Sequence, residues 1–190
     1  MAAEKLAAAG EKPPAPKPVR AALAVADALT AVGAAVGAVA ALGLAAMLIV
    51  EVITTSFFAY SQPYAVEYSG YLLGLVLFAG TGWTLGKGGH IRVEVLADIL
   101  GSERGRLLDL VTSVFALGVV GFVALALTRQ ALRTWELGSR SYFPSETPLV
   151  YPQAMLAAGF ILLTIAFVAR IVRLFVGLPA QDARPITEEA

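Results

Sequence analysis

The stretch TAVGAAVGAVAALGLAAMLIV, Thr30 to Val50, contains no charged residue. The hydrocarbon core of a bilayer is about 30 Å thick, so a spanning helix needs about 20 mostly apolar residues. This stretch meets that requirement and predicts a transmembrane helix. The apolar core of a signal peptide is shorter, about 7–15 residues. We therefore interpret the stretch as an uncleaved signal anchor rather than a cleaved leader.

Three further segments have the same character, and none of them contains a charge. They are Ser69 to Leu85, Leu110 to Thr128, and Leu149 to Ala169. The sequence therefore predicts an all-α membrane protein with four transmembrane helices. Residues 21–177 are expected to form this membrane domain. Residues 1–20, which include the proline- and lysine-rich KPPAPKP, are expected to be a disordered cytoplasmic tail, and residues 178–190 a second cytoplasmic tail.

The composition excludes several classes of protein. Of the 190 residues, 58% are hydrophobic and only 15% are charged, against about 25% charged in a typical soluble domain. The absence of cysteine and the single histidine exclude disulfides, thiolate zinc sites, bis-histidine haem and multi-histidine metal sites. No serine lies in a recognisable nucleophile motif, and the net charge is zero. We expect no enzyme activity, no cofactor and no nucleic-acid partner.

The lysines and arginines predict the orientation of the spans. Cytoplasmic loops of membrane proteins carry an excess of these residues. Of the fourteen lysines and arginines, three lie between spans three and four: Arg129, Arg133 and Arg140. All the others lie in the two tails or between spans two and three. Both termini are therefore predicted to be cytoplasmic, with the chain crossing the membrane four times.

The connection between spans two and three contains GKGGHIRVEVL, Gly86 to Leu96. From Ile91 onward its apolar residues fall on one arc at about 100° per residue, which predicts a short amphipathic helix on the cytoplasmic side. Arg92 falls within that arc. Its guanidinium could reach lipid phosphate, or it could pair with a partner protein. His90 and Glu94 are four apart and can touch, although a two-ligand metal site there is the less favoured alternative.

Span two carries two further candidate features. Glu67 lies at its entrance, where the positive end of the helix dipole favours a carboxylate by about 0.3–1 kcal/mol; docking a partner is the alternative role. Glycines let helix backbones approach closely in membranes, and Gly70, Gly74, Gly82 and Gly86 recur at helical spacing. We propose them, with Glu67, His90, Arg92 and Glu94, as candidate partner-interface residues.

The ionisable residues nearest the four spans lie at the span ends and not within the apolar runs. A transporter with its own ion or substrate route would be expected to carry charges or broken helices at mid-depth. Asp27, Asp109 and Arg170 instead flank the apolar runs. Asp109 and Arg106 are three apart and could pair at the membrane surface. This distribution argues against a transport route within this chain.

The run PYAVEYSGYLLGLVLFAGTGWTLGKGGHIRVEVL, Pro63 to Leu96, resembles the signature of the small permease subunit of tripartite ATP-independent periplasmic (TRAP) transporters, the DctQ-like family. The matching positions are Glu67, Gly80 or Gly82, His90, Ile91, Arg92, Val93 and Glu94. The family usually has aspartate in place of Glu94, and often an arginine after span one that EVITTSFFAYSQ lacks. Gly138-Ser139, Pro148, Pro152 and Gly159-Phe160 also fit. The resemblance covers residues 25 to 177.

This resemblance implies a non-catalytic scaffold subunit. Its expected partners are a large multi-span permease subunit, which carries substrate and sodium, and a periplasmic substrate-binding protein that delivers organic acids. Transport would then be sodium symport. The alternative is a stand-alone four-helix membrane protein, such as an anchor subunit of a membrane enzyme or a small self-associating exporter.

Overall fold

A computed structural model describes residues 16–87 and 102–178 of the chain. The described part is helical and forms no named strand; Arg140 and Pro148 make an isolated antiparallel bridge. This confirms the predicted all-α class. The helices are α2 (Lys17–Phe58), α3 (Ala65–Ala79), α4 (Thr81–Gly86), α6 (Ser102–Leu137) and α7 (Val150–Val176). The predicted amphipathic helix lies outside the described residues.

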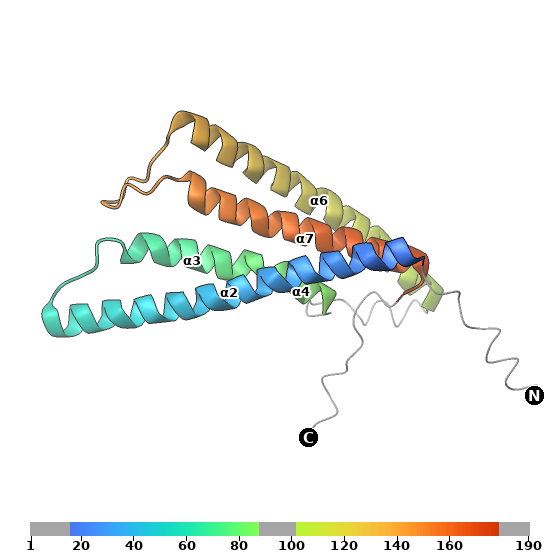
Figure 1. The fold of residues 1–190 in the computed structure, drawn as a ribbon, viewed down its shortest axis with the longest axis horizontal. Coiled ribbons are helices and arrows are strands. Elements are labelled where there is room, and N and C mark those ends of the chain that lie inside the picture. The colour runs from blue at the N-terminus through green and yellow to red at the C-terminus, as the bar shows by residue number, and fades with distance from the viewer. Residues whose placement is uncertain (1–15, 88–101, 179–190) are drawn as a thin grey trace, which may run out of the picture.

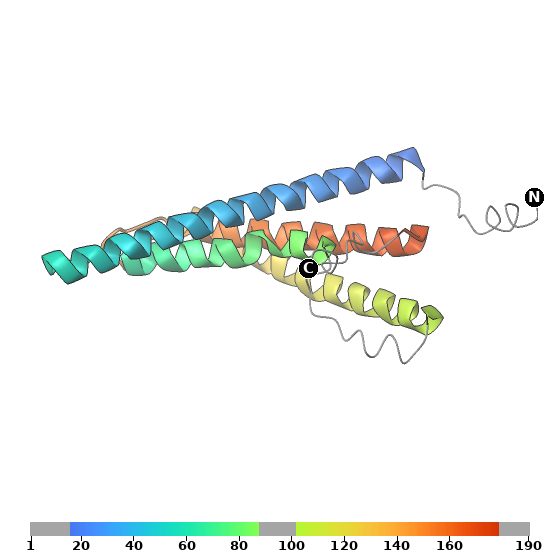
Figure 2. The same cartoon turned by 90° about the horizontal axis from the view of Figure 1, so that it is seen from below.

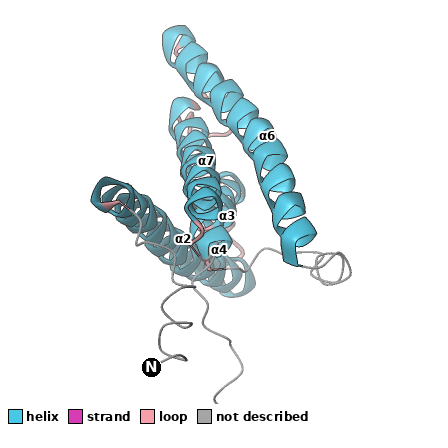
Figure 3. Ribbon diagram, turned by 90° about the vertical axis from the view of Figure 1, so that its right-hand side faces the viewer, coloured by secondary structure: helices cyan, strands magenta, loops and turns pink. Residues whose placement is uncertain are grey.

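Helix α7 lies at the centre of the arrangement. It contacts α2, α3, α4 and α6, whereas α6 contacts only α7 among the described helices (Figures 1 and 3). The connections 59–64 and 138–149 lie at one end of the bundle, which we call the hairpin end. Helices α2 and α6 begin, and α7 ends, at the opposite tail end (Figure 1). The second hairpin, α6 with α7, therefore joins the first through α7.

Three of the described helices are long and apolar enough to cross a membrane: Lys17–Phe58, Leu107–Leu137 and Val150–Val176. They contain the predicted spans one and three, and span four from its second residue onward. Each extends beyond the charge-free run that predicted it. Helix α2, with 42 residues, is about 63 Å long at 1.5 Å per residue, roughly twice the hydrocarbon thickness.

The predicted span two is divided at Gly80. Helix α3 has 15 residues and α4 has 6, so neither alone is long enough to cross a bilayer. Hydroxyls bond to the backbone around the break, because Thr81 Oγ1 donates to Phe78 O at 2.9 Å and Thr84 Oγ1 to Gly80 O at 3.0 Å. Such back-bonding often bends a helix. Three single helices are thus established as candidate spans. The crossing of the membrane by span two stays a prediction.

The bundle turns its large apolar side chains outward. Leu42 is 73% exposed, Phe115 74% and Phe122 73%. The buried hydrophobic residues are mostly alanines. A soluble protein rarely leaves such extended apolar surface in water. Lipid tails are as apolar as leucine, so a membrane helix has no need to bury these side chains and packs instead through small residues.

Two glycines allow the closest helix contacts. A Cβ atom at Gly33 of α2 would lie 2.5 Å from the carbonyl oxygen of Ala79 and 2.7 Å from Leu162 Cδ1. A Cβ atom at Gly159 of α7 would lie 2.9 Å from both Cβ and O of Phe78. The rings of Phe78 and Phe160 stack beside this contact, with centroids 4.9 Å apart. The backbones of α2, α3 and α7 thus approach through positions that carry no side chain.

Gly33→Ala should destabilise the protein, because the new methyl group would overlap a backbone oxygen that cannot rotate away. Overpacking of this kind costs about 1–3 kcal/mol. Gly43→Ala on the same helix is the matched control, since nothing lies within 4 Å of a Cβ at Gly43. Thermal unfolding of both variants in one detergent measures the difference. Equal midpoints would show that α2 does not pack at Gly33 as described.

Candidate functional site

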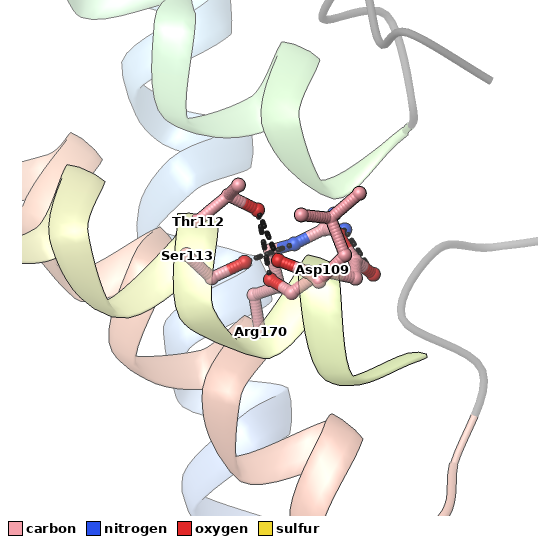
Figure 4. A network of polar contacts seen from close by, with 5 residues as sticks. Asp109, Thr112, Ser113 and Arg170 are labelled. Atoms are coloured by element: carbon pink, nitrogen blue, oxygen red, sulfur yellow. Dashed lines mark hydrogen bonds and ion pairs between the residues drawn. The ribbon is translucent and has the colours of Figure 1, made fainter. Parts of the chain in front are cut away.

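A buried guanidinium joins α6 to α7 near the tail end. Nη2 of Arg170 donates to Oδ1 and Oδ2 of Asp109 at 2.7 and 2.9 Å, and Nε donates to Ser113 Oγ at 3.1 Å (Figure 4). Asp109 and Ser113 are four apart, so they face α7 from the same side of α6. Arg170 is only 3% exposed.

This pair determines how α6 attaches. An arginine buried between helices costs several kcal/mol unless a counter-charge and hydrogen bonds compensate. Asp109 supplies the charge and Ser113 a further acceptor. The carboxylate of Asp109 balances the charge of the guanidinium. Nη1 of Arg170, however, is buried without a hydrogen-bond partner in the structure.

A second ion pair at the tail end joins α2 to α7. Nη2 of Arg173 donates to Oδ1 and Oδ2 of Asp27 at 2.5 and 2.6 Å. The Asp27 side chain is 55% exposed and that of Arg173 13%, so water reaches this pair and weakens it. Asp27 and Asp109 therefore bind adjacent turns of α7 from opposite sides.

The hairpin end is held by a buried carboxylate. Glu67, in the first turn of α3, is 4% exposed. Tyr71 donates from its hydroxyl to Glu67 Oε1 at 2.6 Å, and Ser145 donates to Oε2. Thr147 Oγ1 donates to Ser145 Oγ at 3.0 Å and lies 3.1 Å from the Tyr68 hydroxyl. These bonds attach the α6–α7 connection to the beginning of α3.

The neighbouring α2–α3 connection is held in a similar way. Ser61 Oγ donates to Glu51 Oε1 at 2.7 Å, and the backbone N–H of Gln62 donates to Oε2 at 2.9 Å. Both connections at the hairpin end are thus fixed by a glutamate of an adjoining helix, Glu51 of α2 and Glu67 of α3.

The structure separates the four glycines predicted as one ridge. A Cβ at Gly82 would lie 3.0 Å from Thr30 Cγ2 and 3.1 Å from Leu162 O, and one at Gly74 would lie 3.3 Å from Leu156 Cδ2. Gly82 and Gly74 therefore pack inside the bundle, against α7. Nothing lies within 4 Å of a Cβ at Gly70 or Gly86. Glu67 is buried by contacts within the chain, and His90, Arg92 and Glu94 lie outside the described residues.

The sequence alone places Arg170 and Asp109 at span ends, with Arg106 as a candidate partner of Asp109, and assigns no role to Ser113, Ser145 or the Asp27–Arg173 pair. At the tail end the sequence does contain a pattern that predicts these ion pairs. Two aspartates and two arginines flank charge-free runs at matching depth, and opposite charges at one depth are expected to pair. No comparable signal marks Ser145, because its link to Glu67 spans 78 residues. The suggested pairing of Asp109 with Arg106 falls on a side chain outside those described.

None of these clusters has the composition of a metal site. Within residues 16–87 and 102–178, no group of three or more histidine, cysteine, aspartate or glutamate side chains could hold a metal ion. The oxygens of the Glu67 cluster are used for hydrogen bonds within the chain. The polar contacts described here therefore position helices and connections.

Comparison with known families identifies the chain. Residues 44–177 match the family model described as tripartite ATP-independent periplasmic transporters, DctQ component. The chain belongs to the DctQ family. No curated protein and no solved structure matches it. The DctQ match covers the end of α2 and all of α3, α4, α6 and α7. It therefore includes the Arg170–Asp109 pair and the Glu67 cluster.

Removing Asp109 should destabilise the protein more than removing Arg170. Asp109→Asn leaves a cation that is 4% exposed in its side chain, whereas Arg170→Met leaves a carboxylate that is 27% exposed and can turn to water. We expect Asp109→Asn to lower the free energy of unfolding by about 3 kcal/mol or more, Arg170→Met to lower it by less, and the double variant to cost less than the sum of the two.

Thermal unfolding in one detergent measures this order, with Arg129→Met, an exposed arginine on α6, as control. Strictly additive losses would show that the two side chains do not interact.

Glu67→Gln should loosen the α6–α7 connection, because a neutral amide is a weaker acceptor than a carboxylate for Ser145 and Tyr71. Hydrogen exchange of residues 138–149 should rise several-fold, while exchange in the middle of α7 stays unchanged. Glu146→Gln is the matched control, since Glu146 is exposed in the same connection. If both variants exchange alike, Glu67 does not hold this connection.

Proposed function

We propose that this chain is the non-catalytic scaffold subunit of a sodium-coupled TRAP transporter in a bacterial inner membrane. In this proposal a periplasmic binding protein delivers an organic acid, and a large multi-span permease subunit carries the carboxylate together with sodium. The small subunit holds the large one in place. The observation that carries the proposal is the DctQ match over residues 44–177, because that component belongs to tripartite systems.

The distribution of charge supports an accessory role. Asp27 and Glu51 bound the central part of α2, and Asp109 and Arg170 lie near the tail end of α6 and α7. Substrate and ion routes through membranes expose ionisable groups or broken backbone at mid-depth. Span two is divided at Gly80, but no charged residue lies between Glu67 and Lys87, and the hydroxyls of Thr81 and Thr84 bond to backbone oxygens around the break. The charges described here are instead used in ion pairs and hydrogen bonds that link helices of the same chain.

The fixed contacts support a scaffold. At the tail end, α7 is paired with both α2 and α6, and at the hairpin end Glu67 attaches the α6–α7 connection to α3. A bundle that is linked at both ends changes its helix angles only by breaking these contacts. Such a body suits the stationary part of a transporter, against which a partner moves.

We propose that α3 and α4 together cross the membrane as span two, which brings the number of spans to four. With Gly80 between them, residues 65–86 extend about 33 Å at 1.5 Å per residue, which matches the hydrocarbon thickness. Four crossings place both termini on one side. The excess of lysine and arginine in the tails and in the connection between α4 and α6 makes that side the cytoplasm.

The proposed partner surface combines the connection between α4 and α6 with two glycines. His90, Arg92 and Glu94 carry the family resemblance in that connection. Gly70 and Gly86 are the members of the predicted ridge with open space where a side chain would be. A helix of the large subunit can approach closely at such positions.

Co-purification tests the proposal. The tagged chain, expressed with the large permease subunit of its own system, should elute with it at a constant ratio in mild detergent. The complex in proteoliposomes should take up a carboxylate when binding protein and an inward sodium gradient are both supplied. A chain that elutes alone, or uptake that persists without it, would contradict the scaffold role.

The Arg92→Ala variant of the same preparation should lower the yield of complex and the uptake together, whereas Arg129→Ala on α6 should leave both unchanged.

A further inference from the structure

Helix α2 extends past the rest of the bundle at the hairpin end. It runs antiparallel to α3, and Gly33 of α2 lies against Ala79 of α3 (Figure 1). Continued at an equal rise per residue, this register places Ala65, the first residue of α3, level with about residue 47 of α2. Helix α2 ends only at Phe58, so its last turns reach roughly 15 Å further. They stand beyond the beginning of α3 in both views of the bundle (Figures 1 and 2).

The end of α2 lies outside the hydrocarbon of the membrane. Asp27 and Glu51 bound the part of α2 that crosses the bilayer. They are about 36 Å apart along the helix, at 1.5 Å per residue, which is slightly more than the hydrocarbon thickness. Phe57 and Phe58 follow about 9–10 Å beyond Glu51. Because the headgroup layer on each side is about 5–7 Å thick, the backbone at both residues lies past it.

The side chains at this end of α2 are apolar and uncovered. Phe57 is 80% exposed, Phe58 73% and Ile53 45%, and we call these three residues the α2 tip. The connection that follows does not cover them, because it turns back and Ser61 donates to the carboxylate of Glu51. The α2 tip is thus a bare apolar surface beyond the reach of the acyl chains.

A helix end that is solvated by water has a different composition. The end of α6 also projects past its charge-free run, but it carries the exposed charges Arg133 and Glu136. Between Glu51 and Glu67 the sequence contains no charge at all. Exposed large apolar side chains that neither lipid nor charged neighbours accompany are typical of a surface that another protein covers.

The size of the α2 tip limits what can cover it. Burial of a phenylalanine removes about 150–250 Å² from water, so the two rings supply roughly 300–500 Å². A standard interface needs about 800 Å² on each partner, and a water-soluble protein held by the tip alone would bind weakly. A partner in the same membrane meets the requirement, because contacts between spans add area and raise its effective concentration at the tip.

A second copy of this chain fits the α2 tip poorly. Two tips that met each other would bury only this small area on each side. The hollow that the structure describes beside the α6–α7 connection is lined in part by Thr134, Ser139 and Arg140. A phenyl ring placed there would remove water from the guanidinium without replacing its hydrogen bonds. The occupant is therefore a different membrane protein.

We propose that the α2 tip inserts into an apolar, uncharged pocket that a second kind of membrane protein presents outside the bilayer. In the transporter proposed above this protein is the large permease subunit, and in that form the inference rests on the proposed function. The tip then fixes the height of the scaffold relative to its partner, because lateral contacts between apolar spans do not prevent sliding.

Single cysteines test the position of the tip, because the chain contains none of its own. Ser56→Cys places a thiol at an exposed position beside Phe57 and keeps both rings. In lipid nanodiscs that hold the chain alone, a membrane-impermeant maleimide should label this thiol. In nanodiscs that hold the complex with the large subunit, labelling should slow about tenfold, because a docked segment reacts only when it is transiently released. Tyr142→Cys, fully exposed in the α6–α7 connection, is the control and should be labelled at the same rate in both.

Substitutions at the two phenylalanines test the contribution of the rings. Phe57→Ser with Phe58→Ser should weaken the complex with the large subunit about tenfold or more, because two apolar side chains lose their pocket. Phe57→Leu with Phe58→Leu keeps apolar surface at both positions and should weaken it far less. Both pairs should leave the thermal unfolding of the chain alone unchanged, since the rings are exposed in it. Titration of the tagged chain with the large subunit in mild detergent measures the affinities.

Three results would overturn this proposal and leave the scaffold role intact. A complex in which Ser56→Cys is labelled at the full rate has a free tip. A Ser56→Cys thiol that is not labelled in the chain alone lies in lipid or against a second copy. Equal affinities of the serine and leucine pairs would show that the rings do not enter a pocket. Two proteins that do not co-elute at all would contradict the proposed function itself and remove the large subunit as the partner of the tip.

Discussion

The ion pair between Arg170 and Asp109 determines the architecture, because α6 contacts no described helix other than α7. Much of the surface of α6 is apolar and exposed, so lipid solvates it equally well whether or not it is docked. The hydrophobic effect, which holds soluble bundles together, gives little preference for the docked state in a membrane. A charge that must be paired does give such a preference, since separation would leave a guanidinium in a medium that cannot solvate it. Ser113, which accepts from Nε of Arg170, adds direction to this attraction and fixes the rotation of α6 about its own axis.

The same reasoning explains why polar contacts lie at both ends and small residues lie between them. Between the ends, α2, α3, α4 and α7 are held by close approach at Gly33, Gly82 and Gly159. Dispersion forces between backbones act only at such short distances, and they specify which helices meet but not how they slide. The Glu67 cluster and the Asp27–Arg173 pair supply that second constraint. The first joins a fixed point on α3 to the α6–α7 connection, and the second joins a fixed point on α2 to one on α7.

The sequence predicts the helices well and their partners poorly. A run such as Thr30 to Val50 can only be a helix in a bilayer, since every backbone N–H and C=O must be satisfied within the segment. The helix neighbours depend on rotation and tilt, which hydropathy does not contain. Gly82 and Gly86 therefore look alike in sequence, yet only Gly82 packs against α7. Asp109 has a local candidate partner three residues away, but sequence spacing does not reveal its pairing with Arg170, 61 residues away. The division at Gly80 is likewise absent from the hydropathy, which is continuous from Ser69 to Leu85.

The contact between α2 and α7 follows from these constraints together. Gly33 lets α2 come close to Leu162 of α7, and the Asp27–Arg173 pair joins the two helices again further along. Around this pair the helices also pack through apolar side chains, because Leu23 and Ala26 of α2 are buried with Ala169 of α7. Lipid tails can replace such apolar contacts at little cost, but they cannot replace the counter-charge of an arginine. The position of α2 along α7 therefore depends on the ion pair more than on the apolar surface beside it.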